Sequence, residues 1–238
     1  MKIFGLIGIN LEHSFSKKYF ENKFSELKLH ENKYENFEIN DLESLKKLLT
    51  QNDIRGLNVT IPFKKKIISY LDKVSEDAKE VNAVNTIKII NGKMLGYNTD
   101  TIGFEKSINK ILNNRNKALI LGDGGASNAV KYVLKKKNIK YTTVTRNGEI
   151  NYKSLNDEVI KESDLIINTT PLGTFPNINS FPKINYKMLN SKHLLYDLVY
   201  NPELTLFLKK GLEKGCKIKN GLEMLEMQAE ESWKIWNN

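Results

Sequence analysis

Three polar side chains of different chemistry follow one another in residues 56–64. Asn58 carries an amide, Thr60 a hydroxyl and Lys64 an ammonium group. If these groups face one crevice, they could hold the hydroxyls of a small polyol and protonate one of its oxygens. The alternative is a solvated edge strand followed by a basic helix, and these residues alone do not decide between the two.

The pattern of the same stretch predicts the element that would position these groups. Apolar and polar residues alternate, as in a short strand whose buried face carries Leu57, Val59 and Ile61. Pro62 cannot donate to a neighbouring strand, so we expect the strand to end there and turn toward a helix. Lys64 would then lie just past the strand end, where open α/β sheets bind their ligands.

Two serines follow the apolar stretch Lys2–Gly8, which we expect to form a buried first strand. Ser14 and Ser16 are both residue types that cap helices. The apolar positions that predict a helix behind them are Tyr19, Phe20, Phe24 and Leu27. Either one serine caps this helix and the other has no special role, or both hydroxyls point into the crevice above the first strand.

Asn85 and Asp100 are two further polar candidates. Asn85 lies in the β-rich run 81–90, and a buried asparagine is costly unless it is hydrogen-bonded, so it either braces the backbone or faces a polar ligand. Asp100 precedes a helix that we predict over residues 102–112. Its carboxylate would cap that helix or pair with Lys64.

From Lys117 onward the pattern is that of a dinucleotide-binding unit. A short apolar strand over residues 118–121 leads into a glycine-rich turn and then into a helix through Leu134. In such a unit the pyrophosphate of the cofactor lies at the helix N-terminus. The turn reads Gly122-Asp123-Gly124-Gly125-Ala126-Ser127, with Ser127 in place of the last glycine of the usual motif. Further strands are predicted at residues 140–145, 164–168 and 193–199.

Arg146 indicates the phosphorylated form of the cofactor. It follows Thr145 at the end of the second strand of this unit, the place that contacts the adenosine ribose. NAD enzymes place a carboxylate there, whereas a guanidinium can hold a 2′-phosphate through two parallel hydrogen bonds. We therefore expect NADP, while Glu149, which lies past Gly148, keeps NAD open as the alternative.

The remaining stretches continue the alternation of strands and helices, which predicts an α/β fold with a parallel sheet covered by helices. The last helix is predicted over residues 222–236, and Gln228 lies beside its apolar stripe of Leu222, Leu225, Ala229 and Trp236, a place where glutamine is usually a surface residue. The other predicted elements are a strand at 34–39, a helix after the capping residue Asp41, a helix with apolar residues at 67–71, a hairpin strand at 93–97 after the Asn91-Gly92 turn and a helix at 205–210.

The composition limits the classes of partner that the chain is expected to bind. The 238 residues can form one large domain or two small ones, and the net charge of +9 favours anionic ligands. The lysines are spread along the chain without a basic stripe interleaved with aromatic residues, so we expect no specific nucleic-acid partner. No apolar run is long enough to span a membrane and no signal peptide is expected.

Cysteine and histidine usage predicts neither a disulfide framework nor a metal site. Cys216 is the single cysteine, which fits a reducing cytoplasm. The histidines are His13, His30 and His193, which lie far apart without the spacing of metal ligands. We therefore predict a cytoplasmic protein without a bound metal.

These features, in this order, resemble the shikimate dehydrogenase family, NADP-dependent enzymes of aromatic biosynthesis, over nearly the whole chain. The first set of motifs is His13-Ser14-Phe15-Ser16, Asn58-Val59-Thr60-Ile61-Pro62-Phe63-Lys64, Ala83-Val84-Asn85-Thr86 and Asn98-Thr99-Asp100. The second set is Gly122-Asp123-Gly124-Gly125-Ala126, Asn168-Thr169-Thr170-Pro171-Leu172-Gly173, Asp197-Leu198-Val199-Tyr200-Asn201-Pro202 and Gly221-Leu222-Glu223-Met224-Leu225 with Gln228-Ala229.

The resemblance implies an N-terminal α/β substrate domain over residues 1–100, completed by the C-terminal helix 222–238, and a Rossmann-type NADP-binding domain over 101–221. The active site would lie in the cleft between them. The implied activity is the reversible reduction of 3-dehydroshikimate to shikimate by NADPH, in a monomer or homodimer. One alternative is a quinate/shikimate dehydrogenase that uses NAD. A second alternative is a cofactor-binding regulator of the same fold. The presence of both Lys64 and Asp100 disfavours this alternative.

The resemblance also implies a role for each motif residue. Lys64 and Asp100 would be the catalytic pair, and both would contact the substrate. The other substrate-binding residues would be Ser14, Ser16, Asn58, Thr60, Asn85, Tyr200 and Gln228. The cofactor-binding residues would be Glu76, Gly122, Asp123, Gly124, Gly125, Ala126, Ser127, Thr145, Arg146, Thr169, Leu198 and Gly221.

The chain departs from the family pattern at several positions. Asn10 and Lys17 stand where family members usually have proline, which would make the first loop less rigid. Asp123 replaces a small residue and would weaken cofactor binding by adding negative charge beside the pyrophosphate. A second basic residue that often follows the Arg146 position is missing, so we expect only a modest preference for NADP.

Overall fold

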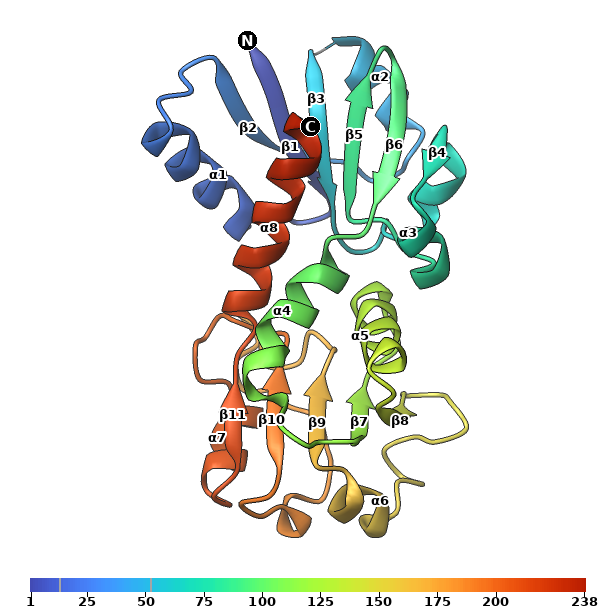
Figure 1. The fold of residues 1–238 in the computed structure, drawn as a ribbon, viewed down its shortest axis with the longest axis vertical. Helices are drawn as coiled ribbons and strands as arrows, with labels where there is room; N and C mark the ends of the chain where they lie inside the picture. The colour runs from blue at the N-terminus through green and yellow to red at the C-terminus, as the bar shows by residue number, and fades with distance from the viewer. Residues whose placement is uncertain (13, 52) are drawn as a thin grey trace. The chain divides into compact units, whose positions relative to one another are not determined.

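The computed structural model describes residues 1–238 except His13 and Asn52, and it divides into two compact units. Unit 1 comprises residues 1–99 and 228–238, and unit 2 comprises residues 100–227 (Figure 1). Each unit has its own sheet and its own hydrophobic core, so we describe them separately. In the part of the chain that the structure describes, no helix is long and apolar enough to cross a membrane.

Unit 1 is built on a mixed six-stranded sheet with strand order β2-β1-β3-β5-β6-β4. Its strands are β1 (Lys2–Gly8), β2 (Asn32–Glu38), β3 (Ile54–Val59), β4 (Lys73–Val74), β5 (Thr86–Ile90) and β6 (Lys93–Tyr97). Its helical segments are α1 (Phe15–Glu26), α2 (Ser44–Gln51), the 3-10 helix η1 (Lys66–Tyr70) and α3 (Glu76–Val81), to which the C-terminal half of α8 (Leu222–Asn237) is added.

The strand directions in unit 1 follow from the connections. β1 is parallel to β2 and β3; α1 connects β1 to β2, and α2 connects β2 to β3. β5 and β6 are antiparallel and are joined by the Asn91-Gly92 turn, whose φ angles of 50° and 73° are those of a tight hairpin. The hairpin predicted from the sequence is therefore confirmed.

The two faces of this sheet are covered by different side chains. One face packs aliphatic residues such as Leu57 and Ile87 beneath α2 and η1. The other face carries an aromatic cluster in which Phe4 and Phe20 of the N-terminal elements pack against Trp236 of α8, with ring centroids 5.0 and 5.2 Å apart. The Trp236 indole nitrogen donates to the carbonyl of Ile87 (3.0 Å), so the end of α8 is an integral part of unit 1.

Unit 2 has a five-stranded parallel sheet with strand order β11-β10-β9-β7-β8. Its strands are β7 (Lys117–Leu121), β8 (Lys140–Val144), β9 (Leu165–Asn168), β10 (Leu194–Asp197) and β11 (Lys217–Lys219). Its helices are α4 (Asp100–Leu112), α5 (Gly125–Lys136), α6 (Asp157–Glu162), the 3-10 helix η2 (Tyr186–Met188), α7 (Leu206–Leu212) and the first turns of α8.

The central strands of unit 2 are buried on both faces, as expected for a parallel sheet covered by helices. Phe104 of α4 and Val130 of α5 pack on one face, and Ile160 of α6 and Phe207 of α7 pack on the other. The strand order reverses at β7, and this is where doubly wound sheets bind their ligands. The predicted α/β fold with a Rossmann-type sheet is confirmed.

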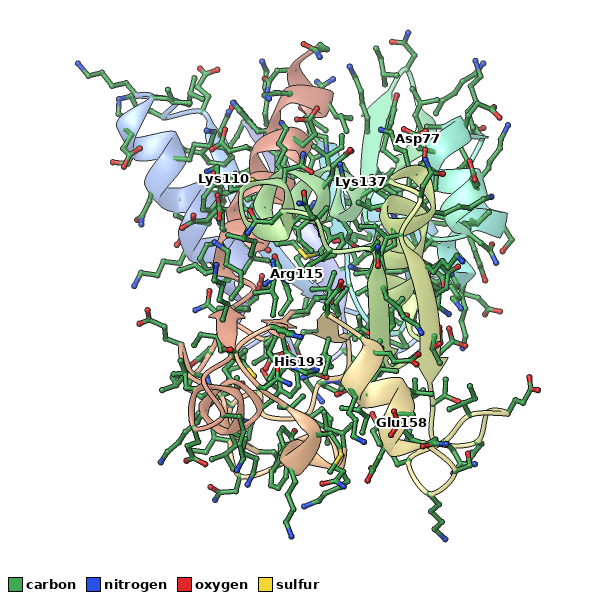
Figure 2. All side chains as sticks on the ribbon, turned by 60° about the horizontal axis from the view of Figure 1, so that its bottom comes forward. Asp77, Lys110, Arg115, Lys137, Glu158 and His193 are labelled. Carbon is green, nitrogen blue, oxygen red and sulfur yellow. The ribbon has the colours of Figure 1, made fainter. Side chains whose placement is uncertain are left out.

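Arg115, labelled in Figure 2, connects the elements at the edge of this sheet where the strands begin. Its guanidinium donates to the backbone carbonyls of Ile111 (3.1 Å) at the end of α4 and Asp164 (3.1 Å) before β9. The Asp164 carboxylate accepts from the backbone N–H of Asn116 and Lys117 at the start of β7 (3.2 and 3.3 Å). Arg115 therefore has a structural role at the edge where the strands begin.

The strand predicted in residues 56–64 ends earlier than expected. β3 stops at Val59, and Ile61, which the alternation placed on the buried face, is 65% exposed. Residues 60–63 form a turn in which the N–H of Phe63 donates to the carbonyl of Thr60 (2.9 Å), because the chain has already left the sheet. The helix predicted after it is only the short 3-10 helix η1.

Several other boundaries also differ from the predictions. The run 81–90 is not one strand, because Val81 ends α3 and Asn82 (φ 54°) is its left-handed cap before β5 begins at Thr86. Asp100 is the first residue of α4 rather than the cap before it. Leu222, expected on the buried stripe of the last helix, is 36% exposed. The short elements β4, α3, α6 and β11 were not predicted.

Candidate active site

Unit 1 contains a cluster of buried polar side chains joined by hydrogen bonds, which we call the polar cluster. Its members are far apart in sequence and come from β3, from β5 and the residue before it, from the residue before α4, and from α8. Asn58, Asn85, Thr86, Thr99, Gln228 and Ser232 form the cluster.

Asn85 is the centre of the polar cluster. Its Oδ1 accepts from the backbone N–H of Thr99 (2.7 Å), and its Nδ2 donates to the Thr99 hydroxyl (2.9 Å) and to Gln228 Oε1 (3.3 Å). Of the two roles left open by the sequence, bracing of the backbone is therefore observed. Gln228 is buried rather than on the surface, because it faces Asn85 from α8.

Asn58 links the polar cluster to the first helix. Its Nδ2 donates to the hydroxyl of Ser232 (3.0 Å), and its Oδ1 accepts from the hydroxyl of Tyr34 (2.8 Å). Burial raises the pKa of Tyr34, so this phenol stays a neutral donor. Ser16, which lies close to Tyr34, opposes this rise of the Tyr34 pKa. Asn58 and Tyr34 are thus joined by a hydrogen bond, with Ser16 of α1 close to the Tyr34 phenol.

The two serines of the first loop have different local roles. Ser14 is the N-cap of α1, and its hydroxyl accepts from the backbone N–H of Ser16 (3.2 Å). Ser16 lies inside the helix, is buried and is close to Tyr34. The motif residue His13, which precedes them, lies outside the described residues.

Lys64 and Asp100 each adjoin a residue that is linked to Asn85. The carbonyl of Lys64 accepts from the N–H of Val84 (2.8 Å), the residue before Asn85. Asp100 is buried and directly follows Thr99, which bonds to Asn85. Thr60 is half-buried, and its N–H donates to the carbonyl of Ile7 (3.0 Å), which fixes the turn that precedes Lys64.

Glu76 and Tyr200 are positioned outside the polar cluster. Glu76 lies in the first turn of α3 with its side chain 88% exposed, and it pairs with Lys79 (2.7 Å), which holds the pKa of the Glu76 carboxyl below its usual range. Tyr200 is half-buried in unit 2, three residues after the end of β10.

In unit 2 the glycine-rich turn connects β7 to α5 at the carboxyl edge of the sheet. Gly122 has φ 112°, and a Cβ on it would come within 2.7 Å of the Thr169 hydroxyl, so a larger residue does not fit. Gly124 is the N-cap of α5, which leaves the first N–H groups of that helix without a side-chain cap. The turn is therefore formed so that backbone N–H groups can face an anion.

Ser127 and Asp123, the two unusual residues of the turn, each have a structural partner. The buried hydroxyl of Ser127 donates to the carbonyl of Gly122 (3.0 Å) and so closes the turn from within. Asp123 pairs with Lys131 of α5 (2.5 Å). This ion pair offsets the negative charge that was expected to weaken cofactor binding.

The other cofactor candidates of unit 2 lie at the same edge. The strands β7, β8, β9 and β10 end level with one another, because Leu121 pairs with Val144 and Asn168, and Asn168 pairs with Asp197. Each of the candidates Thr145, Thr169 and Leu198 is the first residue after one of these strand ends. A Cβ on Gly221 would lie 2.1 Å from the backbone oxygen of Leu198. Gly221 is therefore required for close approach of two backbones at this edge.

A cavity of about 410 Å³ lies at the end of β8. Its lining residues are Arg146, Asn147, Gly148, Asn151, Tyr152 and Lys153. Among the described residues that line it there are two cations and no carboxylate, and Glu149 is not one of them. The volume is within the range of small-ligand sites, and the charge favours an anion.

A buried carboxylate, Asp197, lies at the end of β10. It accepts hydrogen bonds from Asn168 (2.8 Å), from the N–H of Val199 (3.0 Å) and from Thr205 (2.6 Å). Burial raises the pKa of Asp197 to about 6 despite these bonds. Because the folded-state pKa lies above the unfolded value, the stabilisation from this group is fully present below about pH 4 and is lost as the pH rises through about 6.

We therefore expect the substitution Asp197→Asn to remove one pH-dependent contribution to the free energy of unfolding. Relative to the wild type, the variant should gain up to about 3 kcal/mol between about pH 4 and pH 7. Urea unfolding of both proteins across this range measures the difference. Asp53→Asn, an exposed carboxylate, is the control. A constant difference between Asp197→Asn and the wild type at all pH values would contradict the assignment.

Sequence reasoning did not assign several residues of these sites. Thr86 and Thr99 belong to the quoted motifs but were given no role. Ser232 was missed, although it lies one helical turn after Gln228 and therefore on the same face of α8. Tyr34 was taken only as a strand residue. Tyr152 and Lys153 of the cavity were also missed. The described residues contain no group of three or more His, Cys, Asp or Glu side chains that could hold a metal ion.

Comparison with known proteins identifies similar chains over the full length. The family model described as the shikimate dehydrogenase substrate binding domain matches residues 6–87. Shikimate dehydrogenase (NADP(+)) of Clostridium beijerinckii is 38% identical over 251 residues, which cover 99% of this chain and 92% of the relative.

Solved structures agree with this similarity. The crystal structure of shikimate dehydrogenase from Aquifex aeolicus has a TM-score of 0.89 and 37% identity, and the match covers 100% of this chain and 92% of the other. Shikimate 5-dehydrogenase from Thermus thermophilus, solved in complex with NADP(H) and shikimate, has a TM-score of 0.87 and 30% identity, with 99% and 93% covered.

Proposed function

Because this chain belongs to the shikimate dehydrogenase family, we propose that it catalyses the reversible NADPH-dependent reduction of 3-dehydroshikimate to shikimate. When bound, the cofactor supplies the hydride. The residues of the chain must then hold the substrate, exclude alternative orientations and deliver a proton to the carbonyl oxygen that receives the negative charge.

Unit 2 fits a phosphorylated dinucleotide. Gly122 permits the tight turn after β7, where a Cβ would meet Thr169, and the N-terminus of α5 has no side-chain cap, so its backbone N–H groups can bind a pyrophosphate. The two cations of the cavity at the end of β8 suit a 2′-phosphate, and the absence of a carboxylate among its described lining residues disfavours the NAD alternative.

We assign the pyrophosphate to the glycine-rich turn and the adenosine ribose to the end of β8. The residues that would hold the cofactor are Gly122, Asp123, Gly124, Gly125, Ala126, Ser127, Thr145, Arg146, Thr169, Leu198 and Gly221. The exposed position of Glu76 and its pairing with Lys79 make it the weakest member of the set predicted from the sequence.

The polar cluster supports the substrate assignment. Its amides and hydroxyls are fixed by one another in unit 1, so they can present donors and acceptors to a polyol with little loss of side-chain entropy. We propose that Ser14, Ser16, Asn58, Thr60, Asn85, Tyr200 and Gln228 bind the substrate hydroxyls and carboxylate. In this proposal Lys64 is the proton donor and Asp100 orients it and accepts from a ring hydroxyl.

Two observations around Asn85 carry this proposal. The carbonyl of Lys64 accepts from the N–H of Val84, the residue before Asn85. Asp100 directly follows Thr99, whose backbone N–H donates to the Asn85 side chain. The test is an absorbance assay at the band of the reduced nicotinamide, with shikimate or quinate crossed with NADP or NAD. Shikimate with NADP should give the highest kcat/KM. If quinate with NAD is faster, the alternative is correct; if no pair reacts, the proposal is wrong.

The two serines give a prediction that separates binding from helix capping. Ser16→Ala should lower kcat/KM for shikimate by a factor that corresponds to a loss of about 1–3 kcal/mol of transition-state stabilisation, because it leaves a substrate oxygen without a donor. Ser14→Ala should also lower kcat/KM, and it should in addition cost about 1 kcal/mol of unfolding free energy as a lost N-cap. Steady-state kinetics and urea unfolding of both variants measure these effects.

The matched control is Ser44→Ala, which changes an exposed serine in the first turn of α2. Unchanged kcat/KM in Ser16→Ala would show that this hydroxyl does not bind the substrate.

Location and assembly belong to the same proposal. Cys216 is the single cysteine, so the chain forms no internal disulfide, which suits a reducing compartment such as the cytoplasm. We propose a monomer or a homodimer, which light scattering coupled to size-exclusion chromatography would distinguish.

A further inference from the structure

The cavity at the end of β8 contains a second cation that lies seven residues beyond Arg146 in the sequence. Lys153 lines the same cavity as Arg146. Within the described residues, neither the Arg146 nor the Lys153 side chain forms an ion pair. Many other lysines of the described chain do pair with a carboxylate. Two unpaired cations on one concave surface repel each other and favour a bound anion of high charge.

The backbone of residues 150–154 explains how Lys153 returns to Arg146. The N–H of Thr145 donates to the carbonyl of Ile150 (3.1 Å), and Thr145 forms a parallel bridge with Asn151. Asn151 Oδ1 then accepts from the N–H of Lys153 (2.9 Å). This Asx turn fixes the Lys153 backbone against the end of β8 before any ligand is bound.

Tyr152 adds an uncharged donor to the cavity. Its hydroxyl is buried and, within the described part of the chain, has no hydrogen-bond partner. Burial raises the pKa of Tyr152, and the nearby positive charge of Arg146 opposes this rise. The phenol is therefore neutral and close to the guanidinium. A buried hydroxyl without a partner is unfavourable, and a ligand that accepts its hydrogen would remove this cost.

We propose that Lys153 is the second cation of the 2′-phosphate site of the cofactor and that the hydroxyl of Tyr152 donates to the same phosphate. This inference rests on the proposed NADP-dependent function. A phosphate monoester carries a charge of about −1.5 to −2 and three acceptor oxygens. Arg146, Lys153 and Tyr152 together supply two positive charges and donors for all three oxygens. A ribose 2′-hydroxyl would leave both cations uncompensated.

The test is calorimetric binding of adenosine 2′,5′-bisphosphate, 5′-AMP and inorganic phosphate to the full chain, without turnover. The wild type should bind the bisphosphate at least about tenfold more tightly than 5′-AMP. Lys153→Met should weaken bisphosphate binding about five- to tenfold and leave 5′-AMP binding within about twofold. Tyr152→Phe should weaken only bisphosphate binding, by about three- to tenfold.

The matched control is Lys140→Met, which removes an exposed lysine from the opposite end of β8. It should leave the affinities for all three probes unchanged, and thermal melting should show that every variant is folded. If Lys153→Met behaves like Lys140→Met while the wild type still prefers the bisphosphate, the role of Lys153 is wrong and NADP dependence stands. If the wild type binds neither nucleotide, or binds both equally, the inference and the proposed function are both wrong.

Discussion

Replacing Lys64 by alanine should lower kcat by at least about 10²-fold while the affinity for NADPH stays within about twofold. Hydride transfer leaves negative charge on the substrate carbonyl oxygen, and an ammonium group can both stabilise that charge and donate the proton. Lys64 is the one proposed site residue that combines these two properties in unit 1, and its carbonyl is fixed by the N–H of Val84.

Asp100→Asn should have a smaller effect on kcat and should raise the KM for shikimate. The carboxylate is assigned to orienting Lys64 and to accepting from a ring hydroxyl, and an amide can retain only part of both interactions. The comparison of the two variants therefore separates proton delivery from orientation.

The control for Lys64→Ala is Lys65→Ala, because Lys65 is the exposed neighbour with the same charge. It should leave kcat unchanged. Turnover of a folded Lys64→Ala variant at the wild-type rate with saturating substrate would show that another group delivers the proton.

Replacing Arg146 by alanine should weaken NADP binding by about one to two decades and NAD binding by much less. The reason is that a charge-assisted hydrogen bond contributes about 1.5–3 kcal/mol, and NAD has no 2′-phosphate to accept it. Fluorescence titration of the reduced cofactors with the folded variant measures both dissociation constants.

Arg55→Ala is the control for the loss of one positive charge, because Arg55 is exposed in β3 and pairs with Asp53 (3.1 Å). It should not change either dissociation constant. Equal weakening of NADP and NAD by Arg146→Ala would mean that Arg146 contributes only to the general positive field of the protein.

The fold of unit 2 could be predicted well from sequence because each strand is a continuous apolar run. Ala118–Leu121 and the strand that ends at Asn168 are buried on both faces, so their apolar character does not depend on register. The glycine turn after Leu121 is equally clear, since few residues other than glycine tolerate φ 112°.

The errors in unit 1 arise where alternation continues past the end of a strand. Ile61 fits the period of β3, yet the strand has already ended at Val59, and local pattern cannot detect this. Residues 81–90 read as one β-rich run because Val81, which ends a helix, is as apolar as Ile87, which lies in a strand.

The candidate sites were predictable only where a motif is local. Lys64 and Arg146 each follow a strand end and could be assigned from that position. Ser232 and Lys153 could not, because their partners are distant: Ser232 bonds to Asn58 (3.0 Å), and Lys153 reaches the cavity of Arg146 through the Asn151 turn.

The most direct test of the account is the fate of the hydride. 3-Dehydroshikimate should be reduced with NADPH that carries deuterium at carbon 4 of the nicotinamide, prepared separately for each of the two faces, and the product examined by mass spectrometry and NMR. With one face labelled, the deuterium should appear on carbon 3 of shikimate; with the other, it should remain on NADP. Unlabelled shikimate from both cofactors, or no shikimate at all, would contradict the proposed reaction.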